Sequence, residues 1–353
     1  IQIINNITKE EGSQFTKQGR KAICLNCKNS IDYKQIVNDI STRKDKEIIA
    51  VQIQNFKKRS IISPNDTHRS IFNLAEKKLN KNLKKLKDKK MIPDETIFKD
   101  PRSPIQNYGI YRWDQFFNSR QLLFLTTLLN NMDDALSEIK TNEKKKIIAT
   151  YLGLLISKSA DANSLGVHWN TVAQKPEFTM ASRRPSFMLN GVEINPFQSI
   201  GGSLSNNLNS IIRALRFIQD THISCKVSLK SVTDYDESKE KFDLIITDPP
   251  YGDDVQYGEL SDFYYVWLYR ALKPFYNELP SRVRLDEDFC ESKGRFEIKK
   301  HASKFFENGL KKAFKSMSGI LKNDGLCIIF FAHSSPKAWG IFINSIRSAK
   351  LRV

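Results

Sequence analysis

Four consecutive residues, Asp248-Pro249-Pro250-Tyr251, are the part of this sequence whose types most directly specify chemistry. They follow the apolar segment FDLIIT at residues 242–247, which is typical of a buried β-strand. The Asp248 carboxylate and the Pro249 carbonyl both accept hydrogen bonds, and the two prolines hold the backbone extended and remove its own N–H donors. Tyr251 adds an aromatic face. The turn is therefore suited to hold a planar ring that carries an amino group.

An exocyclic amino group of a nucleobase fits this description. Its nitrogen is a poor nucleophile because its lone pair is conjugated with the ring, and hydrogen bonds donated to Asp248 and Pro249 free that lone pair to attack a methyl donor. A base inside a duplex must be flipped out of the stack, and stacking on Tyr251 offsets part of the loss. The alternative is a structural turn after a strand, with Tyr251 as ordinary half-buried packing.

The sequence around this turn resembles a family of adenine-specific DNA methylases that carry a zinc-ribbon insertion. The similarity rests on IITDPPYGDDVQYGELSDFYYVWLYRAL at residues 245–272. It extends, in the family's order, to KAICLNCKNSID, to YRWDQFFNSRQLLFL, to the stretch from Lys158 through ADANSL to INPF and GG, and to GILKNDGLCIIFFAHSSPKAWGIF. The resemblance implies an S-adenosylmethionine-dependent methyltransferase of adenine N6 in DNA, with Asp248, Pro249, Pro250 and Tyr251 as its catalytic turn.

Four residues of the following helix, Ser261, Asp262, Tyr265 and Trp267, also match the family's pattern. Trp267 and Phe263 are four positions apart on that helix, and this spacing favours core packing over contact with a base.

The methyl donor's own site is the point where the sequence departs from the family. Such enzymes hold the donor's amino-acid end on a glycine-rich turn, because only glycine lets the backbone approach that closely. No G-x-G occurs in this chain. The nearest imitation, Gly201-Gly202 before an expected helix at 205–219, indicates a helix start that can still meet an anion such as the donor carboxylate. Gly201, Gly202 and Asp248 are therefore the candidate donor-binding residues.

The family places its donor loop and the first half of its zinc ribbon upstream of the block that begins this chain. The resemblance therefore implies that residues 1–353 are the C-terminal part of a longer enzyme, or one half of a split one. In either case the donor loop and the remaining zinc ligands are expected on an upstream segment or a second chain.

Cys24 and Cys27 form the single C-x-x-C of the chain. One such pair is half of a tetrahedral zinc site, and the resemblance implies that its partners lie upstream. A redox pair is the alternative, which the absence of a thioredoxin-like pattern disfavours. Few cysteines and the lack of an apolar leader predict a reducing, cytoplasmic protein. The other three cysteines are interpreted as inert packing or surface thiols: Cys225, Cys290 and Cys327.

The formal net charge of +17 favours a polyanionic partner, and DNA is the one that the turn implies. Lysines are densest in AEKKLNKNLKKLKDKK at residues 75–90, where Leu74, Leu79, Leu83 and Leu86 form one apolar stripe of a predicted helix. Lys84 and Lys85 are candidate phosphate contacts. The simpler alternative is a docked surface helix covered by solvated lysines.

A second candidate DNA contact is the loop that carries Trp169, Arg183 and Arg184. It is expected to form a wall near the flipped base, with the two arginines on phosphates. A capped loop with a buried tryptophan is the alternative.

The predicted fold class is α/β, with the later strands of a Rossmann-like methyltransferase sheet, a helical insertion and a partial zinc-ribbon-like module. Residues 1–60 are expected to form the β-rich module, 61–220 a mainly helical, DNA-facing insertion and 221–353 the catalytic part. The last range should hold strands at 227–232, 242–247 and 326–332, with helices at 261–272 and 300–321. Their alternation predicts parallel crossover units whose ligands bind at the strand C-termini.

Two further functions stay open from the residues. The target of methylation is alternatively cytosine N4 or a base in RNA, although Asp at the first position of the turn favours N6. Alternatively, the chain is a non-catalytic, basic DNA-binding subunit with a methylase fold, which the missing glycine turn supports.

Overall fold

The computed structural model is of mixed α/β type, with about half of the chain in helices and with short sheets. It describes residues 16–17, 21–23, 27, 29–32, 34–35, 38, 48–55, 58–100, 103–170, 172–173, 175–187, 191–219, 225–239, 241–296 and 298–352. These fall into two compact units, each built from several segments. Unit 1 comprises 1–97, 104–208 and 266–277, and unit 2 comprises 98–103, 209–265 and 278–353. The three successive ranges expected from the sequence stay a prediction.

The described strands of unit 1 are short and antiparallel. A three-stranded sheet consists of β1 (Thr16–Lys17), β2 (Lys21–Ile23) and β3 (Ser30–Asp32). Two hairpins follow, β4 (Val51–Asn55) with β5 (Lys58–Ile62) and β6 (His168–Asn170) with β7 (Lys175–Glu177). Five of these strands lie at the start of the chain, where alternating apolar and polar residues indicate strands.

Helices make up the rest of unit 1, and asparagines begin two of them. They are α3 (Asp66–Asp88), α4 (Ser119–Asn130), α5 (Met132–Ser137), α6 (Asn142–Ala162) and the first turn of α7 (Leu204–Gln219), with 3-10 turns at Pro104–Tyr108 and Trp113–Phe116. The side chains of Asn65 and Asn118 accept the backbone N–H of His68 and Gln121, which satisfies a donor that the helix leaves unpaired. The helix predicted in the lysine-rich residues 75–90 is part of α3, and the helix start predicted near residue 205 is confirmed.

Large aromatic side chains form the centre of unit 1. Trp113, Phe116, Phe117 and Trp267 are each at most 1% exposed. The ring of Phe117 meets that of Trp267 edge-on, with 5.3 Å between centroids. Trp267 lies in α8 (Tyr257–Leu272), whose second half belongs to unit 1. Trp267 and Phe263 are both fully buried, so their predicted role in packing is confirmed.

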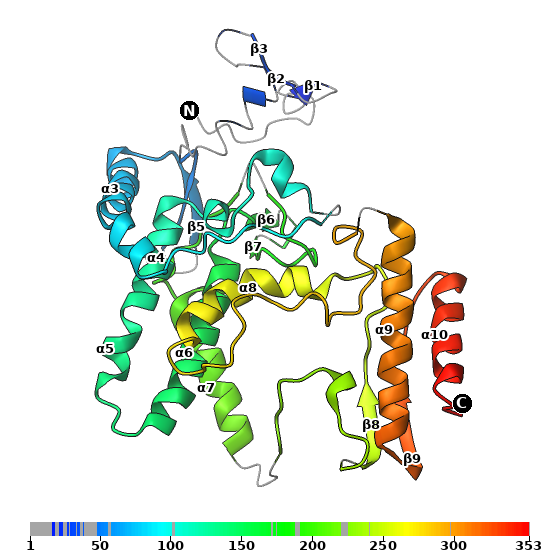
Figure 1. Cartoon of the computed structure of the whole chain (residues 1–353). Coiled ribbons are helices and arrows are strands. Elements are labelled where there is room, and N and C mark those ends of the chain that lie inside the picture. Colours follow the sequence, from blue (N-terminus) through cyan, green and yellow to red (C-terminus); the bar gives the residue numbers. More distant parts are fainter. Residues whose placement is uncertain are drawn as a thin grey trace. The chain divides into compact units, whose positions relative to one another are not determined.

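In unit 2, a parallel pair of strands carries the Asp248 turn. The strands are β8 (Phe242–Thr247) and β9 (Leu321–Ile329), with Leu244 paired to Leu326 and Thr247 to Ile329. The chain between them forms the first half of α8 and then α9 (Lys299–Ile320), and α10 (Pro336–Ser348) follows β9. Figure 1 shows β8 and β9 side by side, next to α9 and α10. The predicted parallel crossover is confirmed, whereas a larger doubly wound sheet is not seen among the described residues.

The strand predicted at residues 227–232 is wrong. Residues 225–231 have no regular secondary structure, and a 3-10 turn follows at Val232–Asp234. Val227 and Leu229 are 89% and 81% exposed. An alternating pattern describes a strand only when a neighbour supplies the hydrogen bonds, and no described strand lies beside this segment.

Two boundaries in unit 2 also differ from the prediction. Helix α8 begins at Tyr257, four residues before the predicted start, and β9 occupies 321–329 rather than 326–332. Among the described helices, none is both long and apolar enough to cross a membrane.

Candidate functional site

The Asp248 turn lies directly after β8, at the end where a parallel sheet binds its ligands. Asp248 is exposed, Pro249 is buried, and Pro250 and Tyr251 are half-buried. The hydroxyl of Tyr251 donates a hydrogen bond to Oδ1 of Asp248. This bond raises the pKa of the Tyr251 phenol, so the hydroxyl stays protonated and continues to donate. The structure thus brings the predicted acid and the predicted aromatic ring together.

The neighbouring strand, β9, supports the turn. The N–H of Phe330 donates to the carbonyl of Thr247 at 2.9 Å, which continues the ladder to the last residue before Asp248. The Tyr251 ring meets Phe331 edge-on, with 5.5 Å between centroids. Phe331 in turn stacks on Phe342 of α10, with 4.1 Å between centroids. The orientation of Tyr251 is therefore fixed by the core of unit 2.

Gly252 makes the sharp exit from the turn possible. Its φ is +82°, a conformation that favours glycine, and an added Cβ would lie 3.6 Å from Nε2 of His333. Its carbonyl accepts the N–H of Glu291 at 2.9 Å. The next residue, Asp253, pairs with Lys293 at 3.1 Å. The pKa of Asp253 is held below its usual value, because Lys293 outweighs the opposing effect of partial burial. The segment around 291–293 therefore holds the loop after Tyr251.

A buried ion-pair network anchors the start of α8. Arg295 donates to both oxygens of Glu259 at 2.8 and 2.6 Å and to Oδ2 of Asp288 at 2.6 Å. Oδ2 of Asp288 also accepts the N–H of Gly258 at 2.8 Å, and Ser292 donates to Glu259 at 2.7 Å. Burial alone would raise the pKa of Glu259, but the hydrogen bond and charge of Arg295 hold it below its usual range. The network fixes the first turn of α8, which begins at Tyr257, seven residues after Pro250.

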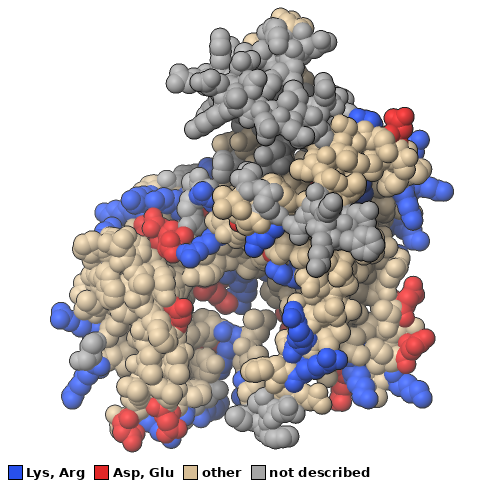
Figure 2. All heavy atoms as spheres, turned by 180° about the vertical axis from the view of Figure 1, so that it is seen from behind, with Lys and Arg blue, Asp and Glu red and all other residues tan. Residues whose placement is uncertain are grey.

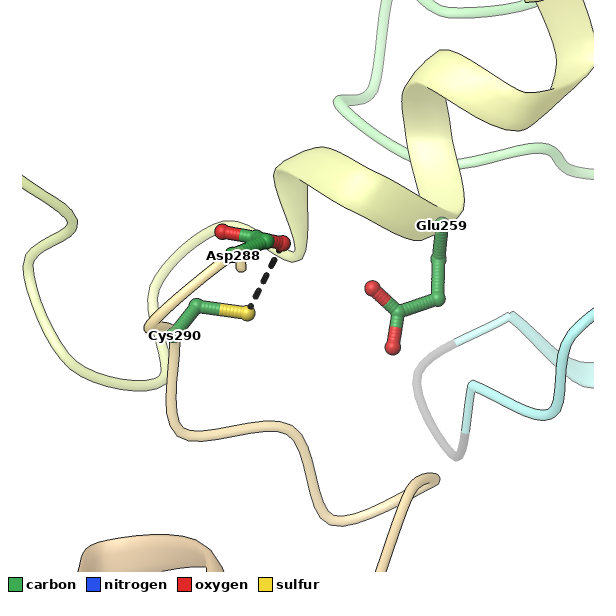
Figure 3. A group of neighbouring side chains, drawn as sticks. All are labelled: Glu259, Asp288 and Cys290. Atoms are coloured by element: carbon green, nitrogen blue, oxygen red, sulfur yellow. Dashed lines mark hydrogen bonds between the residues drawn. The ribbon is translucent and has the colours of Figure 1, made fainter. Parts of the chain in front are cut away.

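The same network contains a group of potential metal ligands. The ligand atoms of Glu259, Asp288 and Cys290 all lie within 4.8 Å of one another. Figure 3 shows the hydrogen bond that the Cys290 thiol donates to Oδ2 of Asp288. The guanidinium of Arg295 occupies the centre of this group, since it also lies 3.2 Å from the Cys290 sulfur. Burial raises the pKa of the Cys290 thiol, so it stays neutral. A divalent ion would have to displace Arg295, so these residues fit an ion-pair network better than a metal centre.

The predicted zinc pair lies largely outside the described residues. Cys24 is not among them, and Cys27 is an exposed free cysteine. The zinc site therefore stays a prediction.

The glycines proposed for the donor belong to unit 1, in the turn before α7. Gly202 has a φ of +85°, and an added Cβ would lie 2.8 Å from the Phe178 ring and 2.9 Å from Ala162. Its carbonyl accepts the side-chain amide of Asn207 at 3.2 Å. Close packing and turn geometry thus account for Gly202. Gly201 has open space around it.

The candidate DNA contacts also belong to unit 1. Lys84 and Lys85 are exposed on α3, while Leu79 and Leu86 of the predicted stripe are buried and Leu83 is half-buried. The stripe does not extend to Leu74, which is 63% exposed. Arg183 and Arg184 are exposed, and Arg183 has a positive φ of 55°. Trp169 is half-buried in β6, whose neighbours His168 and Asn170 both bond to Glu177.

Sequence reasoning missed most of the network around the turn. Asp262 was singled out from the sequence but its partner Arg282 was not, and the pairing of Glu259 with Arg295 was not predicted. Asp262 is fully buried and accepts Arg282 at 2.9 Å. These arginines lie 20 to 36 positions from their partners, so no local spacing connects them. The signal in the sequence was the presence of two acids, Glu259 and Asp262, on an otherwise apolar helix, because buried acids need partners.

Comparison with models of known protein families, with curated proteins and with solved structures gave no match.

Proposed function

We propose that this chain is the base-binding part of an S-adenosylmethionine-dependent methyltransferase that acts on adenine N6 in DNA. One observation carries the proposal. An exposed carboxylate, Asp248, stands at the C-terminal end of a parallel strand, bonded to the hydroxyl of an aromatic residue three positions later. This combination suits the capture of a flat ring with an amino group, and it is the turn on which the family resemblance rests.

The residues of the turn have separate tasks. The base amino group donates to Asp248 and to the Pro249 carbonyl, and these two acceptors set its position. A carboxylate accepts several hydrogen bonds, so Asp248 can hold Tyr251 and a base at once. The Tyr251 ring, fixed against Phe331, offers a face to the flipped base. Catalysis here depends on orientation more than on acid–base transfer.

The proton that the amine releases needs no dedicated acceptor in this chain. His333 lies beside the exit of the turn, since a Cβ on Gly252 would be 3.6 Å from its Nε2. The Nδ1 of His333 accepts the N–H of Ser335 at 2.9 Å. Its Nε2 lies 3.8 Å from Oδ1 of Asp253. These contacts support a structural role for His333 in the loop after β9.

The described residues fit the methyl donor less well than they fit the base. S-adenosylmethionine supplies the methyl group, and the nitrogen gains a C–N bond while the donor loses its S–C bond. The chain has no G-x-G, and packing explains Gly202. The tasks assigned to this chain therefore end with binding and orienting the base.

The test is transfer of a radiolabelled methyl group to unmethylated duplex DNA, with this chain alone and together with the polypeptide encoded directly upstream. Asp248→Ala is expected to lower transfer at least about 100-fold, as the loss of a key hydrogen-bonding group does elsewhere. Asp324→Ala removes an exposed carboxylate at the other end of the same sheet and should leave transfer unchanged. Chromatography of the nucleosides then identifies the product. N4-methylcytosine, or preferential methylation of competing RNA, would replace the proposed target.

A non-catalytic DNA-binding subunit is the second candidate. The net charge of +17 and the missing glycine turn favour it, and Figure 2 shows Lys and Arg side chains spread over the face in view. This candidate predicts DNA binding that Asp248→Ala leaves unchanged, with no methyl transfer in either mixture. Transfer that depends on Asp248 excludes it.

A further inference from the structure

One face of α9 carries a stripe of lysines. Lys300, Lys304, Lys311 and Lys315 follow one another at spacings that place them within a sector of about 60° on a helix with 3.6 residues per turn. All are exposed except Lys311, which is half-buried. The helix contains six lysines but a single acid, Glu307, which pairs with Lys311 at 2.6 Å. These four lysines are called the α9 stripe below.

The opposite side of α9 is buried, so the direction in which the stripe points is fixed. Four large side chains of that side belong to the hydrophobic core of unit 2: Phe306, Leu310, Phe314 and Met317. Figure 1 shows α9 alongside β8 and α10. An interfacial helix needs a free apolar face to enter a membrane surface, and the apolar face of α9 is used inside the protein. An anionic membrane therefore does not account for the stripe.

The protein itself does not neutralise the stripe. Among the described residues, only Lys311 of the stripe forms an ion pair. The ammonium groups of Lys300, Lys304 and Lys315 are thus available to an external anion. Several like charges held along one rigid helix attract a polyanion more strongly than a small ion, because each neutralised phosphate releases counterions.

Helix stability gives no reason for lysines at the start of α9. This helix has no acidic residue in its first turn and no basic residue in its last, and it begins with Lys299 and Lys300. Helix α3 has the opposite arrangement, with Asp66 in its first turn and Lys85 and Lys87 in its last. Cations near a helix N-terminus oppose the helix dipole, so the charges of α3 stabilise their helix and those of α9 do not. An anion bound along α9 would explain its charges.

The stripe begins beside the predicted base-binding turn. The hydroxyl of Ser303 donates to Glu291 at 2.6 Å, and the N–H of Glu291 donates to the carbonyl of Gly252, in the loop after the turn. At the other end of α9, the side chain of Lys241, just before β8, donates to the carbonyl of Gly319. The helix therefore runs antiparallel to β8, and the stripe extends away from the turn over about 22 Å, at roughly 1.5 Å per residue.

We propose that the α9 stripe binds the phosphate backbone of duplex DNA on one side of the flipped base. The choice of DNA rests on the proposed function, whereas a polyanionic partner follows from the charges of α9 alone. Phosphates of one strand recur roughly every 3.4 Å along the duplex axis, so the stripe is as long as about six base pairs. Lysine contacts phosphate as a point charge and carries no sequence information there. The stripe therefore positions the duplex and does not select its sequence.

The test is the salt dependence of binding to an unmethylated duplex of mixed sequence, measured by fluorescence anisotropy with the whole chain. Substituting glutamine for Lys300, Lys304 and Lys315 together should lower the slope of log K against log salt by about 2.7, and Lys304→Gln alone by about 0.9. Both variants should melt within about 2 °C of the wild-type chain, because the three side chains are exposed. An unchanged slope means that the lysines are solvated, and it overturns the proposal.

A matched control removes three other exposed cations of unit 2. Arg347, Lys350 and Arg352 lie at and after the C-terminal end of α10, the end farther from β9 along the chain. Their joint replacement by glutamine changes the net charge by the same amount and should lower the slope by less than about 0.5. An equal fall in the two triple variants would show that general charge and not the α9 stripe holds the DNA, which also overturns the proposal.

Two further outcomes separate this surface from the proposed function. If the chain transfers methyl groups, the stripe variant should raise KM for DNA and leave kcat within about twofold, because phosphate contacts position the duplex without touching the reacting atoms. Stripe-dependent DNA binding without any methyl transfer leaves the surface standing and removes the proposed catalysis instead. Stripe-dependent preference for a structured RNA competitor overturns the assignment to DNA.

Discussion

The helical core of unit 1 and the parallel sheet of unit 2 bury their apolar side chains to very different extents. Phe116, Phe117 and Trp267 are completely buried in unit 1. In unit 2, Ile246 and Phe330 are 60% and 57% exposed although both lie in or next to strands. Among the described residues, the aromatic side chains at the centre of unit 1 are enclosed, whereas one face of the β8–β9 pair is exposed. The Asp248 turn follows the strand whose side chains are the more exposed.

This difference teaches how stability and function are divided in the chain. A closed core stabilises the fold without help from another molecule, while an open sheet gains stability when something binds to it. The Asp248 turn is held by its neighbours in unit 2, since Phe330 continues the ladder to Thr247 and Phe331 meets the Tyr251 ring.

The largest expected effect is the difference in stability between two Phe→Ala substitutions, one in each unit. Phe117→Ala removes a ring that is 0% exposed and should lower the free energy of unfolding by about 3–5 kcal/mol. Phe330→Ala removes a ring that is 57% exposed and should cost less than about 1 kcal/mol. Urea unfolding followed by circular dichroism measures both. Equal losses would show that the exposed face of the sheet is in fact covered.

A slightly smaller effect is expected at the ion-pair network. Arg295→Met leaves Glu259 and Asp288 without their shared cation, and breaking a buried ion pair on one side costs about 3 kcal/mol or more. Arg284→Met is the control, because Arg284 pairs with Glu287 at the surface, where such pairs contribute about 0–1 kcal/mol. A loss at Arg295 no larger than at Arg284 would mean that the network does not anchor α8.

The network also gives stability a pH dependence. The pKa of Glu259 is lower in the folded protein than its usual value of about 4.3, so folding favours the ionised form. Its stabilising contribution is therefore present above about pH 4 and is lost as the pH falls through the lower folded pKa. Thermal melts between pH 3 and 6, in steps of roughly one pH unit, should show the melting temperature falling as the pH falls. Glu259→Gln should make this fall smaller.

The smallest effect on stability is expected at the exposed lysines of unit 1. Lys84→Gln with Lys85→Gln should change the free energy of unfolding by less than about 0.5 kcal/mol. If both contact phosphates, the slope of log K against log salt for duplex DNA should fall by about 1.8. An unchanged slope would assign α3 to a docked helix with solvated lysines.

Local patterns were sufficient for the parts of the fold that local chemistry decides. The helix predicted at 205–219 is α7, and the leucine spacing in residues 75–90 predicted part of α3. Strand β8 has the predicted bounds because FDLIIT is mainly apolar and is followed by Asp248-Pro249-Pro250, whose prolines cannot continue a ladder.

Other parts depend on contacts between distant residues, and the sequence does not show these. Residues 227–232 alternate as a strand would, but pairing requires a neighbour that the described residues do not provide. The partners Arg295 and Glu259 are separated by 36 positions, and only the folded chain joins them. For the candidate site, the turn itself was predictable, while the network that anchors it was not.

The parallel pairing of β8 and β9 has a consequence for the order of events during synthesis. Thr247 pairs with Ile329, about eighty residues later in the chain, and ribosomes add about 5–20 residues per second. The apolar strand FDLIIT therefore emerges several seconds before its partner exists. During that interval the segment has no partner strand, and unpaired apolar strands are prone to aggregate. The charges of Lys241 and Asp243 at its start oppose such aggregation.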